Sequence, residues 1–277
     1  MQPTIITVAI NGAIARKKNN PAVPISPDEA VASAQEAFEK GATVLHVHAR
    51  NPDESPSSEP DYFAEVQEGM RRHCPEMIVQ FSTGGRGRDP AARGSALYLK
   101  PEMASLSTGS VNFPKGIYEN PVELVEQLAS SMVQYEIKPE IEAFDLSMLY
   151  AAKTLVDREL LKAPLHVQFV MGVPNAMPAR RKALEFMVSE LHELLPGSTW
   201  TVAGIGRHQA EAHHWAVEMG GHIRTGLEDN LRIGDRLADS NAELVSLAAE
   251  ICREHGSRHA TPAEAREFLG LAAGVSA

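Results

Sequence analysis

Short apolar runs alternate along the chain with longer stretches in which polar residues interrupt the apolar ones. The short runs are rich in β-branched residues and bounded by glycine or polar residues, which is typical of buried strands. Eight such runs are present, at 4–11, 42–50, 77–85, 103–113, 138–145, 165–172, 199–206 and 221–229. Most of the stretches between them have helical spacing, and we expect helices at 26–41, 61–72, from Pro121 onward, 146–161, 179–194 and 208–219.

The segment 26–41 carries the clearest helix signals. Ser26 is placed as an N-cap, Pro27 takes the first helical position, Glu29 completes a capping box and Gly41 ends the helix.

Eight strands separated mostly by helices predict an α/β fold, a (β/α)₈ TIM barrel. A doubly wound sheet is the alternative, but no glycine-rich dinucleotide turn follows the first strand. Two further helices, at 241–255 and 262–270, follow the eighth strand and are expected to cap the barrel or to form an oligomer contact. With no repeat or linker visible, we expect one catalytic domain over residues 1–277.

Composition restricts the possible partners. The net charge of −10 argues against nucleic acid, because binding to phosphates needs a basic surface. No apolar run reaches the roughly 18 residues of a membrane span, and the N-terminus lacks the charged region of a signal peptide. Cys74 and Cys252 are far apart and fit two reduced thiols. We therefore expect a cytoplasmic enzyme that does not bind membranes.

Two histidines end the second apolar run, in "GATVLHVHAR". Alternating strand side chains place His46 and His48 on the same face. Two imidazoles on one face suit a metal ion, although each could instead bond to a carbonyl group.

Other polar residues also gather where strands end, which is where barrels carry their catalytic groups. They are Ser82, Ser105, Ser107, Thr108, Glu140, Glu142, Arg224, Glu228 and Asp229, and the glycines Gly84 and Gly85 lie beside Ser82. Each has a structural alternative. The hydroxyls could bond to backbone, Glu140 or Glu142 could pair at the surface with Lys138 or Arg158, and Arg224 with Glu228 could be an ion pair. Their coincidence at one rim favours an active site, with the Gly84 and Gly85 amides open to an anion.

Glu228 is the expected third metal ligand, because it should share the inward face of the last strand with Arg224. Two imidazoles, a carboxylate and an open position are typical of catalytic zinc, and Fe(II) is the alternative. His222, at the start of that strand, is expected at the opposite end of the barrel.

The chain resembles the β-keto acid cleavage enzymes, a family typified by 3-keto-5-aminohexanoate cleavage enzyme. The likeness covers nearly the whole chain and lies in "HVHAR", "FSTGG", "KPEMASLSTGSVNF", "KPEIEAFD", "TWTVAGIGR" and "GGHIRTGLEDN". It implies a zinc-dependent barrel, usually a homotetramer, that converts a β-keto acid and acetyl-CoA into acetoacetate and a new acyl-CoA.

The resemblance also implies roles for residues. Zinc would be held by His46, His48 and Glu228, and the polar and catalytic positions would be Ser82, Ser105, Ser107, Glu142, Arg224 and Asp229. A guanidinium is a reluctant base, so we favour Asp229 as base or proton relay and Arg224 as the group that stabilises negative charge. Glu142 would orient Arg224 or relay a proton.

The substrate pocket departs from the type member at Ile14, where that enzyme has a glutamate for the substrate ammonium. We therefore expect a neutral or anionic keto acid, with the basic loop 15–20 available to a distal carboxylate. For acetyl-CoA, the segment 204–209 offers free amides and Arg207 as a phosphate anchor, although a plain turn is equally compatible. A metal-dependent aldolase or hydrolase acting without CoA, or a non-catalytic metal-stabilised barrel, are the alternative functions.

Overall fold

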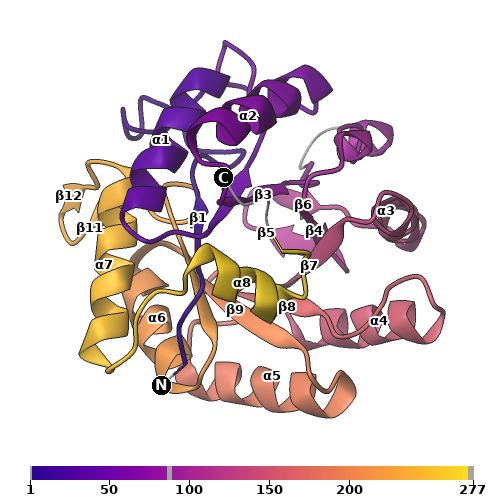
Figure 1. Cartoon of the computed structure of the whole chain (residues 1–277). Coiled ribbons are helices and arrows are strands. Elements are labelled where there is room, and N and C mark those ends of the chain that lie inside the picture. Colours follow the sequence, from indigo (N-terminus) through magenta and orange to yellow (C-terminus); the bar gives the residue numbers. More distant parts are fainter. Residues whose placement is uncertain (1, 86–88, 274–277) are drawn as a thin grey trace.

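Eight parallel strands close into a barrel in the computed structural model, which describes residues 2–85 and 89–273 (Figure 1). The order around the barrel is β1, β2, β3, β4, β7, β8, β9 and β10, with β10 returning to β1. The strands are β1 (Ile6–Ala9), β2 (Val44–Val47), β3 (Ile78–Phe81), β4 (Met103–Ser107), β7 (Lys138–Ala143), β8 (His166–Met171), β9 (Thr199–Gly204) and β10 (His222–Thr225). The predicted (β/α)₈ barrel is confirmed.

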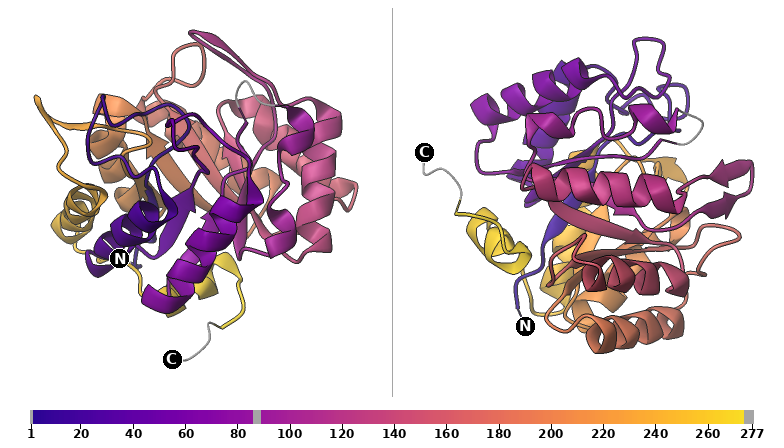
Figure 2. Two further views of the ribbon diagram at one scale, coloured as in Figure 1. Left: turned by 90° about the horizontal axis from the view of Figure 1, so that it is seen from above. Right: turned by 90° about the vertical axis from the view of Figure 1, so that its right-hand side faces the viewer.

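Helices surround this barrel, as the two views of Figure 2 show. They are α1 (Pro27–Glu39), α2 (Pro60–His73), α3 (Val122–Gln134), α4 (Leu146–Asp157), α5 (Arg181–Leu194), α6 (Gln209–Glu218) and α7 (Asn241–Glu254). The capping box predicted for α1 is present, with Ser26 and Glu29 each bonded to the other's backbone. No helix of the described residues combines the length and the apolar character needed to cross a membrane.

The last helix, α8 (Pro262–Leu269), closes the N-terminal end of the barrel (Figure 1). Its Ala265 and Leu269 pack in one buried cluster with residues at the starts of the first four barrel strands, Ile5, Val44, Ile78 and Met103. Of the two roles expected for the C-terminal helices, the cap is confirmed for α8. The C-terminal end of the barrel stays open to ligands.

The predicted strand 103–113 is wrong in its second half. β4 ends at Ser107, and β5 (Val111–Phe113) instead forms an antiparallel hairpin with β6 (Gly116–Tyr118). The polar residues at 108–110 interrupt the apolar run, and the next apolar residues pair locally. This β5–β6 hairpin projects from the C-terminal end of the barrel (Figure 2).

The predicted strand 221–229 is also too long. β10 ends at Thr225, and Gly226 follows with φ +133, where a Cβ atom would lie 2.1 Å from the Ala9 carbonyl oxygen. That carbonyl accepts a hydrogen bond from the Glu228 N–H at 3.1 Å. Glu228 and Asp229 therefore reach the rim from a turn, not from a strand face. A short antiparallel ribbon with two residues in each strand, β11 (Arg232–Ile233) and β12 (Arg236–Leu237), follows the turn.

Candidate metal centre and active site

His46, His48 and Glu228 converge at the open end of the barrel. Their nearest ligand atoms all lie within 4.8 Å of one another. The two Nε2 atoms are 3.2 Å apart, and Glu228 Oε1 lies 3.2 Å from His48 Nε2. The grouping depends on barrel closure, because β1 pairs with both β2 and β10. The three residues named from the sequence are thus brought together.

Neighbouring amides hold the His46 imidazole and the His48 backbone. His46 Nδ1 lies 2.5 Å from Gln80 Oε1, which is its partner in the β2–β3 register, so Nε2 faces the cluster. Asn11 accepts a hydrogen bond from the His48 N–H and donates one to the His48 carbonyl, at 3.1 and 3.0 Å. Sequence reasoning missed Gln80 and Asn11, although the position of Gln80 in the strand beside His46 was a usable signal.

The charge states of His46 and Glu228 suit the binding of a divalent cation. Burial lowers the pKa of His46 to about 4, so its imidazole is neutral at pH 7. Burial raises the pKa of Glu228, but the Arg224 charge and the two imidazoles outweigh it and hold that pKa well below its usual range. Glu228 Oε2 is buried without a hydrogen-bond partner among the described residues. Two imidazoles and a carboxylate with a free oxygen fit zinc, and they also fit Fe(II).

Arg224 lies beside this cluster and bonds to several carboxylates. Its Nε and Nη2 donate to both oxygens of Asp229, at 2.7 and 2.9 Å, and Nη2 lies 2.9 Å from Glu228 Oε1. Burial opposes the charge, yet the carboxylates, Asp229 first, raise the pKa of Arg224 well above its ordinary value. Burial also raises the pKa of Asp229, and the Arg224 charge offsets this only in part. Asp229 is thereby a better proton acceptor than an exposed aspartate.

Glu142 is a further buried carboxylate beside Arg224. Ser107 Oγ donates to its Oε2 at 2.6 Å, and Arg224 Nη1 lies 3.9 Å from its Oε1. Burial raises the pKa of Glu142 despite these contacts. The surface pairings considered for it do not occur, because Lys138 Nζ donates to a backbone carbonyl and Arg158 pairs with Glu126.

These groups line a pocket of about 430 Å³ at the C-terminal end of the barrel. Its lining includes the following residues named from the sequence: Ile14, His48, Ser82, Gly84, Gly85, Glu142, Arg224, Glu228 and Asp229. The side chain of Ile14 is 62% exposed, which places it at the mouth as predicted. Ser105 is fully buried behind the pocket, where its Oγ accepts from the Thr83 N–H at 3.3 Å.

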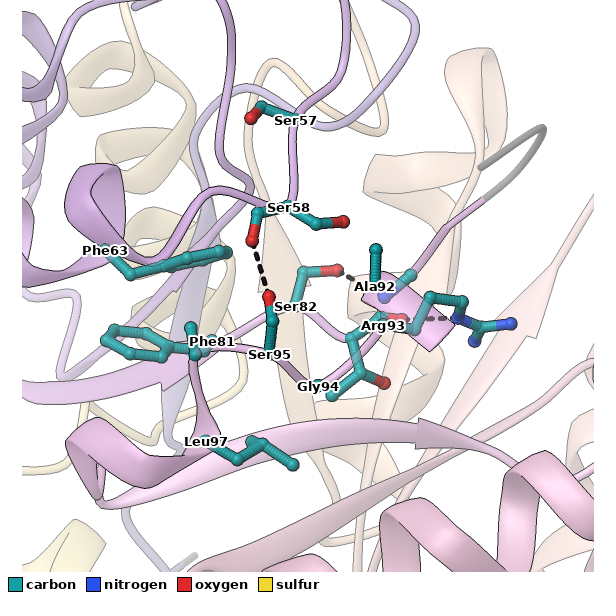
Figure 3. Close-up of a pocket in the computed structure, with 13 residues that line it drawn as sticks. Ser57, Ser58, Phe63, Phe81, Ser82, Ala92, Arg93, Gly94, Ser95 and Leu97 are labelled. Carbon is teal, nitrogen blue, oxygen red and sulfur yellow. Dashed lines mark hydrogen bonds between the residues drawn. The ribbon is translucent and has the colours of Figure 1, made fainter. Parts of the chain in front are cut away.

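The loop after β3 is held by an arginine that the sequence reading did not identify. Arg93 Nε donates to the Thr83 carbonyl at 2.8 Å, and its guanidinium also bonds to Tyr118 and Asn120. Figure 3 shows Arg93 beside Ser82, in a hollow of about 10 Å³ that is too small for a substrate. A Cβ atom at Gly85 would lie 2.4 Å from Arg93 Cδ, so a larger residue there would displace the Arg93 side chain.

Two predicted anion-binding amides are already engaged. The Gly84 N–H donates to Ser82 Oγ at 3.1 Å, and the Gly206 N–H donates to the Asp229 carbonyl at 2.8 Å. The prediction of free amides at these two positions is therefore wrong. Arg207 itself is exposed on the short helix Gly206–His208. It lines a second hollow, of about 700 Å³, that adjoins the 430 Å³ pocket.

His222 lies at the opposite end of the barrel, as expected. Its Nδ1 accepts from the Ile5 N–H at 3.1 Å, and its ring packs against Phe268 of α8.

Comparisons with known proteins agree with this geometry. The family model described as beta-keto acid cleavage enzyme matches residues 3–271. The chain is 56% identical, over 98% of its length and 95% of the relative, to the 3-oxoadipate:acetyl-CoA acetyltransferase of Cupriavidus necator. It is 40% identical, over 98% and 99%, to the 3-keto-5-aminohexanoate cleavage enzyme of Fusobacterium nucleatum. The apo structure of ObcA shares the fold, with a TM-score of 0.82 at 22% identity, over 91% of this chain and 66% of that one.

Proposed function

This chain belongs to the beta-keto acid cleavage enzyme family, and we propose that it converts 3-oxoadipate and acetyl-CoA into acetoacetate and succinyl-CoA. The observation that carries the choice of substrate is the 56% identity to a relative named for that acid. Ile14 supports it, because an aliphatic side chain at the pocket mouth offers no acceptor for the ammonium of 3-keto-5-aminohexanoate.

His46, His48 and Glu228 would hold a zinc ion at the inner end of the pocket. Bound there, the ion would polarise the ketone and carboxylate oxygens of the keto acid and make the carbon between them acidic. Ser82 and Gly85, which line the same pocket, would contact the keto acid, with Ser105 supporting the loop from behind.

The first half of the reaction forms a carbon–carbon bond. Asp229 removes a proton from C2 of the keto acid, because its raised pKa suits it to accept one. The C2 carbanion attacks the thioester carbonyl of acetyl-CoA, and the CoA thiolate leaves. Arg224, a permanent cation beside Asp229, stabilises the negative charge that develops on the oxygens.

The second half breaks a different carbon–carbon bond. The CoA thiolate adds to the original C3 ketone, the C2–C3 bond breaks and succinyl-CoA forms. C2 then takes the proton back from Asp229, which releases acetoacetate and restores the carboxylate. Glu142, whose pKa burial raises, orients Arg224 and is placed to relay a proton.

Acetyl-CoA would approach through the second hollow, which shares Ile14, Glu228 and Asp229 with the substrate pocket. The exposed guanidinium of Arg207 would contact a CoA phosphate there. The single catalytic domain, the homotetramer and the cytoplasmic location also stand as proposals, and light scattering of the purified protein tests the assembly.

The direct test is an assay of the metal-loaded protein with 3-oxoadipate, with and without acetyl-CoA, followed by mass spectrometry. Acetoacetate and succinyl-CoA should appear in equal amounts and only when both substrates are present. Cleavage of the keto acid without acetyl-CoA would instead indicate the alternative, a metal-dependent aldolase or hydrolase.

A further inference from the structure

Lys115 lies in the turn of the β5–β6 hairpin and lines the substrate pocket, as Ile14 does. It is exposed and forms no ion pair with any described residue. Arg224 is the other lysine or arginine that the described lining contains, and it is bonded to Asp229 and Glu228. Lys115 is therefore the cation of the described lining that is free to meet a substrate.

The hairpin is held firmly over the pocket. The Phe113 ring stacks on the Tyr118 ring, with centroids 6.0 Å apart and planes at 16°, and meets Phe144 edge-on at 5.7 Å. The Tyr118 hydroxyl lies 3.2 Å from Ser107 Oγ and donates to it, because the proton of Ser107 is donated to Glu142. These contacts fix the position of the backbone that carries Lys115 relative to Glu142.

The charges of the described lining favour such a cation for a dicarboxylic substrate. Among the described lining residues, Glu142, Glu228 and Asp229 contribute carboxylates, and Arg224 is the arginine that faces them. Even with a metal ion offsetting these carboxylates, a second substrate carboxylate at the pocket mouth would lose its hydration without a partner of its own.

Two of the three cations of the basic loop 15–20, considered first for this role, are engaged elsewhere, and the third, Lys18, does not line the pocket. Lys17 pairs with Glu29 at 2.7 Å, and Arg16 donates to the Asp53 carbonyl. Neither side chain lines the substrate pocket.

We propose that Lys115 binds the distal carboxylate of a dicarboxylic β-keto acid and so determines substrate specificity. The proposal rests on the proposed function and names the chemistry that its pocket selects. The far end of the substrate would lie between the Lys115 ammonium and the aliphatic side chain of Ile14, with its methylenes against the isoleucine.

The test compares 3-oxoadipate with 3-oxohexanoate, which has the same carbon chain but ends in a methyl group. Lys115→Gln removes the charge, Lys115→Arg keeps it, and Lys18→Gln removes an exposed charge from the rim loop that does not line the pocket. We expect Lys115→Gln to lower kcat/KM for 3-oxoadipate about three- to tenfold through KM, as for one partly exposed ion pair. The value for 3-oxohexanoate should stay unchanged, and the other two variants should behave like wild type with both acids.

An equal effect of Lys115→Gln on both acids would overturn the proposal and leave the reaction class standing. A rise in KM for acetyl-CoA alone would also overturn it, because Lys115 would then serve the CoA phosphates. Equilibrium binding of the two acids to the metal-loaded protein, without acetyl-CoA, gives the same comparison without turnover. Weaker binding of 3-oxoadipate to Lys115→Gln supports the proposal even if no acetoacetate forms. The absence of acetoacetate would refute only the proposed function.

Discussion

Arg224 binds the carboxylate of Asp229 at two points, with Nε 2.7 Å from Oδ2 and Nη2 2.9 Å from Oδ1. The same Nη2 lies 2.9 Å from Glu228 Oε1. One guanidinium therefore connects the proposed base to the proposed metal ligand. This contact is possible because the chain turns sharply at Gly226 and brings residues 228 and 229 back over the end of β10.

Asp229→Asn should strongly slow proton transfer, while its amide oxygen can keep one of the two hydrogen bonds from Arg224. We expect kcat to fall by about 10²–10⁴-fold, because an amide cannot accept the C2 proton. Metal content should stay at the wild-type level, since Asp229 is not one of the three clustered ligands. Steady-state kinetics and elemental analysis measure both, with the exposed Asp235→Asn as a control. A kcat near the wild-type value would remove Asp229 from the mechanism.

Gln80→Leu should weaken metal binding although it leaves the three proposed ligands unchanged. The Gln80 amide oxygen lies 2.5 Å from His46 Nδ1 and fixes the direction of the ring. Loss of such an outer contact costs about 10–100-fold in metal affinity. Chelator competition measures this, and Gln168→Leu is the matched control, because Gln168 is equally buried but bonds to Arg224. Equal affinities in wild type and Gln80→Leu would contradict the orienting role.

Gly226→Ala should disrupt the turn that presents Glu228 and Asp229. Its Cβ would lie 2.1 Å from the Ala9 carbonyl oxygen, at a φ of +133. We expect the free energy of unfolding to fall by about 3 kcal/mol or more, with loss of bound metal.

Gly234→Ala is the control for backbone conformation alone. Gly234 also has a positive φ, of +58, but a Cβ there meets no described atom within 4 Å. That variant should lose only about 1–2 kcal/mol and keep its metal. Similar losses in both variants, measured by urea unfolding, would show that the Ala9 contact is unimportant.

The pH dependence of stability should contain a contribution from His222. Burial lowers the pKa of this imidazole to about 3, and the nearby His166 ring adds to the effect. An unfolded histidine has a pKa near 6.5, so between these values the unfolded state binds a proton that the folded state excludes. Stability is therefore lost as pH falls below about 6.5. Between pH 7 and pH 5 this one group should cost about 2 kcal/mol.

Urea unfolding of wild type and His222→Asn at the two pH values, with chelator present, measures this contribution. The asparagine oxygen can still accept from the Ile5 N–H but does not titrate. The variant should lose about 2 kcal/mol less than wild type over the interval. Equal losses would mean that His222 is protonated in the folded state.

Much of the fold and part of the site follow from local sequence patterns. The capping box of α1 and the alternation of strands and helices depend on neighbouring residues, so a single sequence contains them. His46 and His48 share a face because of strand geometry alone. The third member of the cluster, Glu228, was placed there by assuming a closed barrel, although the assumed strand extended too far and the residue lies in a turn.

The supporting contacts could not be predicted, because they depend on register and on loop geometry. Gln80 meets His46 only through the β2–β3 register, and Asn11 meets His48 across the end of β1. Tyr118 reaches Ser107 only because residues 111–118 fold back as a hairpin, whose first strand the apolar pattern had merged with β4. The same hairpin carries Lys115, so the pattern gave no reason to consider that lysine.

The most direct test of the account is the fate of labelled acetyl carbons. Metal-loaded protein is incubated with unlabelled 3-oxoadipate and acetyl-CoA that carries ¹³C at both acetyl carbons, and the products are analysed by mass spectrometry and NMR. The mechanism predicts acetoacetate labelled at C3 and C4 together with unlabelled succinyl-CoA, because the acetyl group joins C2 of the keto acid before the C2–C3 bond breaks. Labelled acetate with 3-oxoadipyl-CoA, or labelled succinyl-CoA, would contradict it.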